Sequence, residues 1–214
     1  MYQLYFYPGN ANLAPHMVLE EIGAPYELIL VDRNKHAHKS AEYLTLNPTG
    51  RIPVLVDGDL VLFEAAAICL HLADRHPEVR LAPPLGSAER GECYKWLMYL
   101  TNTLQAELIT YYYPERLSDD AAAAARVKAY AENRMGGMLD IVEAALAAHG
   151  GPYLLGERYS IVDPYLLMLS RWTRYLAHPA RCRPHLGCYL QRIVTRQAVQ
   201  RAFAGEGLAA PFYG

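Results

Sequence analysis

Apolar and polar positions in the first third of the chain follow a strand period and a helix period in turn. Residues 3–7 and 26–31 alternate as strands do, whereas residues 14–22 place apolar side chains at helical spacing until Gly23 ends the run. The expected order is strand 3–7, helix 14–22, strand 26–31, helix 40–46, a hairpin within 52–63 and helix 64–75. Strands joined by helices indicate a parallel pair, and the Asp57-Gly58 turn adds an antiparallel edge.

The pattern lapses between residues 77 and 86, where three prolines occur, and everything beyond reads as helix. We therefore expect a thioredoxin-like α/β domain over residues 1–76, a linker over 77–86 and an all-α domain over 87–214. Two long antiparallel helices are expected from two apolar stripes, Cys93, Trp96, Leu97, Leu100, Leu104 and Leu108, and Val127, Tyr130, Met138, Ile141, Val142 and Ala145.

A third helix of this domain, around Tyr165 to Leu169, is apolar on every side and should be buried. Two residues are candidates for the N-cap of this helix. Ser160 and Asp163 have capping-box spacing, whereas Pro164 favours Asp163 as the N-cap because proline suits the first helical position. Either N-cap gives Asp163 a structural role.

Composition and charge narrow the function classes. The chain has 214 residues, is 52% hydrophobic and carries a net charge of -2, so it has ample core and no long-range attraction to nucleic acid or to an anionic membrane. No apolar run approaches a bilayer span and the N-terminus lacks a signal-peptide pattern, which predicts a cytoplasmic protein. The four cysteines lack zinc spacing, so we expect buried reduced thiols and no metal.

The segment from Arg171 to Arg201 contains seven arginines and no acidic residue. Solvated helix faces explain these arginines as well as a polyanion-binding surface does.

The stretch from Asn47 to Ala65 has the chemistry of a peptide-binding site. An X-Pro bond at Ile52-Pro53 is cis at modest cost, and a cis bond would turn the Ile52 amide and carbonyl outward to pair with an extended peptide. Glu64 then begins a helix, whose free N–H groups suit a carboxylate. Together these groups predict a site for a small peptide that carries an ammonium and a carboxylate.

Four motifs in the same order resemble the cytosolic glutathione transferases, and most closely the bacterial, beta-like class. They are Tyr7-Pro8-Gly9 with Leu13-Ala14-Pro15-His16, Asn47-Pro48-Thr49-Gly50-Arg51-Ile52-Pro53, Tyr153-Leu154-Leu155-Gly156 and Ser160-Ile161-Val162-Asp163. The resemblance spans nearly the whole chain. It implies a homodimeric transferase that binds glutathione as co-substrate through Ile52, Pro53, Glu64 and Ala65, with Lys35 at the glycyl carboxylate.

The resemblance fails at the residue that would contact the thiol. Beta-like enzymes carry a cysteine at the position of Ala11, so a mixed disulfide is excluded there. An asparagine amide can donate a hydrogen bond to a thiolate without acting as a base. The candidates are Asn12, which takes the position of the serine after the family cysteine, then Asn10, then Tyr7 as the tyrosine of mammalian-type classes.

Three further positions depart from the family. Ala65 replaces the usual serine and leaves only its N–H for the glutamyl carboxylate, Gln105 replaces a histidine of the beta-like enzymes, and Met98 replaces an asparagine. The resemblance places the electrophile pocket between the domains, against the helix that carries Tyr111, Tyr112 and Tyr113, where aromatic rings suit flat apolar substrates. Helical geometry allows at most two of the three to share a face.

Two functions follow from this pattern. The first is an enzyme that activates glutathione as its thiolate and adds it to a small hydrophobic electrophile, since the anion is the nucleophile and a free thiol titrates near about 8.5. The alternative is a non-catalytic glutathione-binding or scaffold protein, because Ala11 and Gln105 replace groups that beta-like enzymes use.

Overall fold

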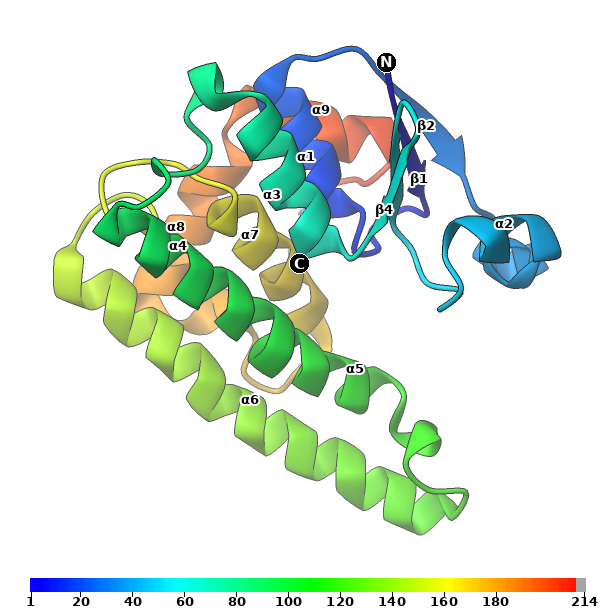
Figure 1. Cartoon of the computed structure of the whole chain (residues 1–214). Helices are drawn as coiled ribbons and strands as arrows, with labels where there is room; N and C mark the ends of the chain where they lie inside the picture. The colour runs from blue at the N-terminus through cyan, green and yellow to red at the C-terminus, as the bar shows by residue number, and fades with distance from the viewer. Residues whose placement is uncertain (211–214) are drawn as a thin grey trace. The chain divides into compact units, whose positions relative to one another are not determined.

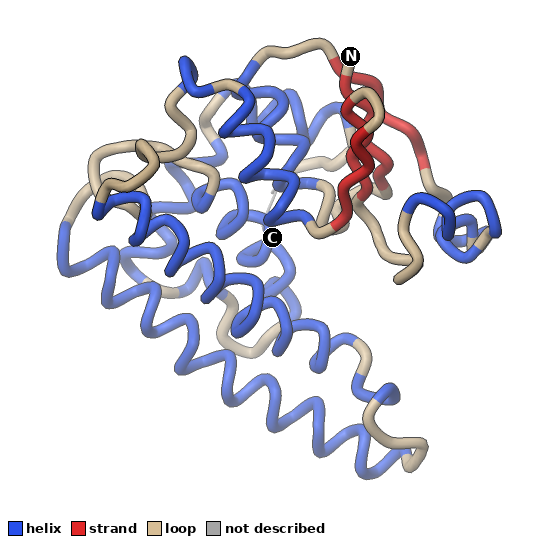
Figure 2. Tube along the Cα trace, viewed as in Figure 1, coloured by secondary structure: helices blue, strands red, loops and turns tan. Residues whose placement is uncertain are grey.

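The computed structural model describes residues 1–210, which form two compact units. The first unit comprises Met1–Pro83 together with the segment that starts at Ile193, and the second comprises Pro84–Arg192. The division after Pro83 falls inside the expected 77–86 linker. Strands occur in the first unit, whereas the second is helical (Figure 2).

The first unit is built on a four-stranded mixed sheet in the order β2-β1-β3-β4. The strands are β1 (Tyr2–Phe6), β2 (Tyr26–Leu30), β3 (Val54–Asp57) and β4 (Leu60–Phe63). β1 is parallel to β2 and antiparallel to β3, while the hairpin that turns at Gly58 (φ 61°) pairs β3 with β4. The βαβαββα order and the thioredoxin-like fold expected from the sequence are confirmed.

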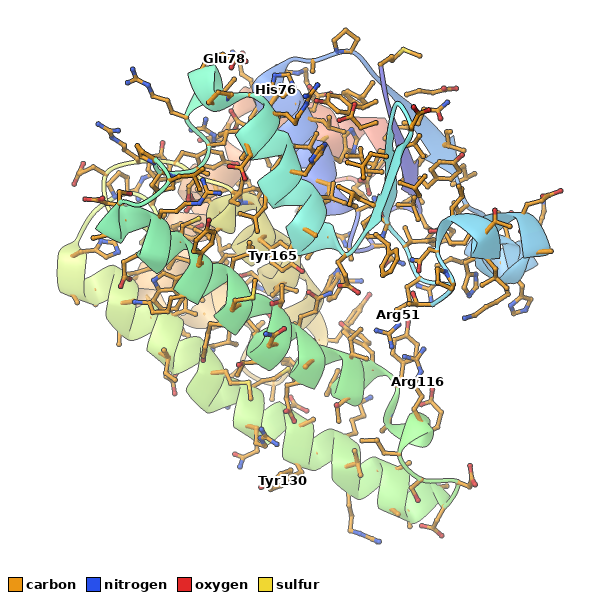
Figure 3. The ribbon with its side chains drawn as sticks, in the orientation of Figure 1. Arg51, His76, Glu78, Arg116, Tyr130 and Tyr165 are labelled. Carbon is orange, nitrogen blue, oxygen red and sulfur yellow. The ribbon has the colours of Figure 1, made fainter. Side chains whose placement is uncertain are left out.

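Helices cover both faces of this sheet (Figure 1). α1 (Leu13–Ile22) and α3 (Ala65–Arg75) pack against each other on one face, and α2 (Ala41–Leu46) lies on the other. Alternation along β1 buries Leu4 and Phe6 toward the first face and turns Tyr5 into a cluster with Tyr43 of α2. At the start of β1, the Tyr2 hydroxyl forms a hydrogen bond with Nε2 of His76. The other ring nitrogen of His76 contacts Glu78, and both of these residues lie just beyond α3 (Figure 3).

The last helix, α9 (Gln197–Gly205), belongs to the first unit and packs against α1. It buries Val199 and Phe203, each contributing about 1.5–3 kcal/mol. Arg196 forms a bidentate pair with Glu21 of α1, and Arg201 pairs with Glu20. The expected 87–214 domain therefore differs from the structure at its end, because an amphipathic stripe does not reveal which neighbour covers it.

The second unit is built from α4 (Ala88–Tyr99), a π-helical turn (Leu100–Gln105), α5 (Ala106–Tyr112), α6 (Ala121–His149), α7 (Val162–Trp172) and α8 (Pro184–Val194). The first predicted stripe, from Cys93 to Leu108, is buried throughout. The second was wrong at Tyr130 and Ile141, which are exposed on α6. The buried face of α6 is instead Ala131, Met135, Met138, Leu139, Val142 and Leu146, because the helix is rotated relative to the predicted stripe.

Two further expectations from the sequence, that the four cysteines are buried and that the arginines of residues 171–201 lie on solvated helix faces, hold only in part. Cys69 and Cys93 are buried, but Cys182 and Cys188 are exposed, because they lie where the chain enters α8 and on its outer face. Of the seven arginines, Arg183 pairs with Asp140, and Arg196 and Arg201 pair with α1 carboxylates. These pairs show that part of the basic segment is neutralised within the fold.

The start of α7 is organised by the buried carboxylate of Asp163. Its Oδ2 accepts from the Ser160 amide (2.7 Å) and hydroxyl (3.3 Å), and its Oδ1 accepts from the Leu154 amide (2.9 Å) and the Tyr189 hydroxyl (2.8 Å). The carboxylate thus reaches back as a capping box requires, although the Asp163 amide bonds to the Ser160 carbonyl rather than to its hydroxyl. Burial raises the pKa of Asp163 to about 6, against the opposing effect of these donors.

Replacing Asp163 with alanine leaves the buried amides of Leu154 and Ser160 without an acceptor, and leaves the Tyr189 hydroxyl only the main-chain carbonyl of residue 163, at 3.4 Å. We expect Asp163→Ala to lower the free energy of unfolding by about 3 kcal/mol, measured by urea denaturation at pH 7. The exposed Asp119 provides the control, since Asp119→Ala should change stability by less than about 0.5 kcal/mol. Equal effects of the two substitutions would contradict the structural role of Asp163.

Candidate functional site

The turn after β1 brings the candidate thiol-binding residues together. Gly9 adopts a positive φ of 69°, and the Asn10 amide donates to the Tyr7 carbonyl at 3.1 Å. The Leu13 amide then donates to the Asn10 carbonyl at 3.0 Å, and α1 begins. The turn therefore presents Asn10 at its outside and directs Asn12 inward.

Asn12 is fully buried and both ends of its amide are used by the protein. Oδ1 accepts from the Tyr7 amide at 3.1 Å, and Nδ2 donates to Oε1 of Glu206 at 2.8 Å. The same carboxylate accepts from the Gly9 amide (2.8 Å) and contacts Nδ1 of His16 (3.0 Å). These contacts give Asn12 a role in holding the turn and count against it as a donor to sulfur.

Asn10, in contrast to Asn12, uses only one end of its side-chain amide within the protein. Its side chain is half-buried, and Oδ1 accepts from the Ala11 amide at 2.8 Å. Its Nδ2 group makes no hydrogen bond within residues 1–210. A hydrogen-bond donor is therefore available at the outside of the turn. Tyr7 is half-buried in the cluster with Tyr43 and Ile52, and the Arg33 guanidinium lies 5.9 Å from its ring centre.

The peptide bond between Ile52 and Pro53 is cis, as expected. The carbonyl of Arg51, labelled in Figure 3, accepts from the Tyr43 hydroxyl (2.7 Å) and from the Asn47 amide (2.8 Å). In the described part of the chain, neither the Ile52 amide nor its carbonyl has a hydrogen-bond partner. These contacts fix the segment before the proline and leave one main-chain donor and one acceptor available at Ile52.

Glu64 occupies a strained position at the start of α3. It is exposed and has φ 73° and ψ 109°, a conformation that non-glycine residues rarely adopt. The first intrahelical bond runs from the Ile68 amide to the Glu64 carbonyl (3.0 Å), so the amide of Ala65 and the two that follow have no partner within the helix. A carboxylate beside free helix N–H groups can bind an ammonium and a carboxylate of one ligand together.

Cationic side chains lie beside the same segment. Lys35 is exposed and its Nζ lies 3.6 Å from Asp32. The sequence analysis missed Lys39, whose Nζ lies 3.5 Å from the Thr49 carbonyl, and His38, whose buried Nδ1 has no hydrogen-bond partner in the described chain. Burial and the neighbouring Arg33, Lys39 and His36 lower the pKa of His38. The clue in the sequence was the basic pair directly before helix 40–46.

The predicted electrophile residues have partners inside the second unit. Tyr111 is buried and its hydroxyl lies 3.4 Å from the Tyr175 carbonyl, while the Tyr112 hydroxyl donates to the Trp172 carbonyl at the end of α7. Gln105 ends the π-helical turn, and its Oε1 accepts from the buried Tyr165 hydroxyl (Figure 3). A contact between Tyr111 or Tyr112 and an electrophile stays a prediction.

Within residues 1–210, no group of three or more His, Cys, Asp or Glu side chains is placed to hold a metal ion. Likewise, none of the described helices combines the length and apolar character needed to cross a membrane.

Comparison with known proteins shows matches over both units. Residues 1–74 match the model of the glutathione S-transferase N-terminal domain, and residues 102–202 match a model of the C-terminal domain. Glutathione S-transferase GstA of Escherichia coli O157:H7 is 30% identical over 208 residues, covering 96% of this chain and 99% of that protein.

Two solved structures extend this likeness to three dimensions. A glutathione transferase homologue from Sulfitobacter with bound glutathione has a TM-score of 0.88 and 27% identity, covering 98% of this chain and 99% of that one. A bacterial beta class enzyme from Sphingomonas chungbukensis has a TM-score of 0.80 and 29% identity, covering 97% and 100%.

The different bonding of the two asparagines predicts different losses of stability. Asn12→Ala removes an acceptor from the Tyr7 amide and a donor from the buried Glu206, so we expect it to lower the free energy of unfolding by about 2–3 kcal/mol. Asn10→Ala removes one bond to the Ala11 amide and should cost under about 1 kcal/mol. Urea denaturation of both variants tests this, and a reversed order would contradict the assignment of Asn12 to the core of the turn.

Proposed function

The chain belongs to the glutathione S-transferase family, and we propose that it conjugates the glutathione thiolate to small hydrophobic electrophiles, with the Asn10 side chain stabilising the thiolate. The chain is a glutathione transferase, with family domains over both units and curated relatives of that name along nearly its whole length. The observation that carries the proposed site is Glu64 in its strained conformation beside the free amides of α3.

Glutathione binds in this proposal along the first unit. Its γ-glutamyl carboxylate meets the N–H groups that start at Ala65, and its ammonium meets the Glu64 carboxylate. The cysteinyl amide and carbonyl pair with the main chain of Ile52, which has both partners to offer. Lys39 or Lys35 neutralises the glycyl carboxylate. Glutathione bound in the Sulfitobacter homologue supports this ligand.

The thiol would lie over the turn that contains Asn10. A hydrogen bond from Nδ2 to a charged sulfur contributes about 1.5–3 kcal/mol, which corresponds to lowering the thiol pKa by about one to two units. The helix dipole of α1 adds about 0.3–1 kcal/mol if its N-terminus faces the sulfur. These two terms are enough to make a thiol of pKa near about 8.5 substantially ionised at neutral pH. Asn12 and Tyr7 are the remaining donors if Asn10 fails.

The proposal also covers the electrophile and the assembly of the protein. Tyr111 and Tyr112 offer aromatic surface for a flat apolar substrate, and family membership favours a homodimer in the cytoplasm, which light scattering can test. A non-catalytic glutathione-binding protein is the second candidate. It is favoured by Ala11 at the position of the class cysteine and by Gln105, whose Oε1 is already bonded to Tyr165.

Titration of bound glutathione tests the role of Asn10. The wild type should show the ultraviolet absorbance of a thiolate at pH 7, and Asn10→Ala should raise the apparent pKa of the bound thiol by one to two units. Asn133→Ala, on the exposed face of α6, is the control and should leave it unchanged. An ordinary thiol pKa in the wild type would favour the non-catalytic protein instead.

Calorimetric binding tests the role of Glu64. Glu64→Gln should raise the Kd for glutathione about tenfold to a hundredfold, because it removes a charged acceptor for the ammonium. Glutaryl-cysteinylglycine lacks that ammonium, so the same substitution should change its Kd by less than about threefold. Glu42→Gln, on the exposed side of α2, is the matched control. A similar loss for both ligands would show that Glu64 acts without contacting the ammonium.

A further inference from the structure

A chain of hydrogen bonds connects the thiol-binding turn to the surface through the fully buried His16. On one side, His16 Nδ1 lies 3.0 Å from Oε1 of Glu206, the carboxylate that also holds Gly9 and Asn12. On the other side, His16 Nε2 lies 2.9 Å from the Tyr26 hydroxyl.

This series of hydrogen bonds ends at the surface of the first unit. The Tyr26 hydroxyl contacts Glu20, and Glu20 accepts from the Arg201 guanidinium. A side chain at Gly205 would meet His16 Cε1 at 3.1 Å, so the backbone of α9 covers the ring closely. His16 is thus enclosed by groups from α1, β2, α9 and the residue that follows α9.

The charge of His16 follows from counting the hydrogens available to the hydrogen bonds that link Glu206, His16, Tyr26 and Glu20. Glu20 lies against Arg201, and although burial opposes it, the bonds from Tyr26 and Arg201 lower the pKa of Glu20, so this carboxylate only accepts. Tyr26 stays protonated, because burial and Glu20 raise its pKa, and its one proton goes to Glu20. The Tyr26 oxygen must then accept from the Nε2–H of His16.

The other ring nitrogen also faces an acceptor. Oε1 of Glu206 receives the Asn12 amide, whose orientation is fixed because its Oδ1 faces the Tyr7 N–H, and Oε2 receives the Gly9 amide. Each oxygen of Glu206 therefore accepts a hydrogen bond, and the contact from His16 Nδ1 brings a further group to Oε1. Both nitrogens of His16 therefore donate, as in the imidazolium.

We propose that His16 is held as an imidazolium, so that the Glu206 carboxylate fastens both ends of the thiol-binding turn without adding net negative charge beside the glutathione sulfur. This rests on the proposed function, since it concerns a thiolate at Asn10, which lies between Gly9 and Asn12. His16 is a positioning and charge-compensating residue here, because it acts through Glu206 and touches no substrate.

The charge can be tested by titrating bound glutathione in three variants of the full chain. His16→Gln leaves Glu206 uncompensated and should raise the thiol pKa by about one unit. Glu206→Gln removes the negative charge but also replaces one acceptor of the turn by a donor, so its own thiol pKa serves as the reference for the structural effect. In that background, adding His16→Gln should shift the thiol pKa by less than about 0.3 unit. His71→Gln, which breaks a partly exposed histidine–carboxylate pair with Asp57, is the control.

The outcomes separate charge from structure. An equal shift on His16→Gln in the wild-type and Glu206→Gln backgrounds, or a folded His16→Gln with an unchanged thiol pKa, would overturn the proposal. If His16→Gln does not fold, long-range ¹H–¹⁵N correlation of the wild-type imidazole at pH 7 decides. Two protonated nitrogens are expected, and one protonated and one bare nitrogen would overturn it. That spectrum needs no glutathione, so a wild type without any thiolate signal overturns the proposed function alone.

Discussion

The first unit depends on one buried carboxylate near the end of the described chain. Glu206 accepts hydrogen bonds from the main chain of Gly9 and the side chain of Asn12, and it pairs with His16, all more than 180 residues earlier in the sequence. Removing it would leave several buried donors unpaired, each at a cost of about 1–3 kcal/mol. The turn after β1 therefore has its shape only when α9 is packed against α1.

This constraint explains how a site can be built largely from main-chain groups. The groups assigned to glutathione are the amides at the start of α3, the amide and carbonyl of Ile52, and a turn whose interior is filled by Asn12 and Glu206. Main-chain groups need a rigid frame, because they cannot adjust by rotating a side chain. Glu64 in its strained conformation is consistent with this view, since such a residue persists only where the surrounding structure determines it.

The sequence predicted the parts of this arrangement that local patterns determine. Alternation, helical spacing and the Asp57-Gly58 turn were enough for the order of the elements and for a sheet with both parallel and antiparallel pairs. The cis bond after Ile52 was expected from the proline that follows it and from the family resemblance. The sequence did not predict that Asn12 turns inward, because its partner is Glu206 and no local signal links two positions so far apart. For the same reason the pairing of α9 with α1 was missed. On α6, Tyr130 and Ile141 are apolar but lie off the buried face, which only packing defines.

The proposed site requires that the turn presents Asn10 to the glutathione sulfur while Asn12 faces Glu206. A crystal structure of the complex with glutathione tests it most directly. We predict that the sulfur lies within hydrogen-bond distance, about 3.5 Å, of Asn10 Nδ2, with the γ-glutamyl carboxylate at the amide of Ala65. A sulfur held by the Tyr7 hydroxyl or by Asn12, or glutathione bound away from Ile52 and Glu64, would contradict it.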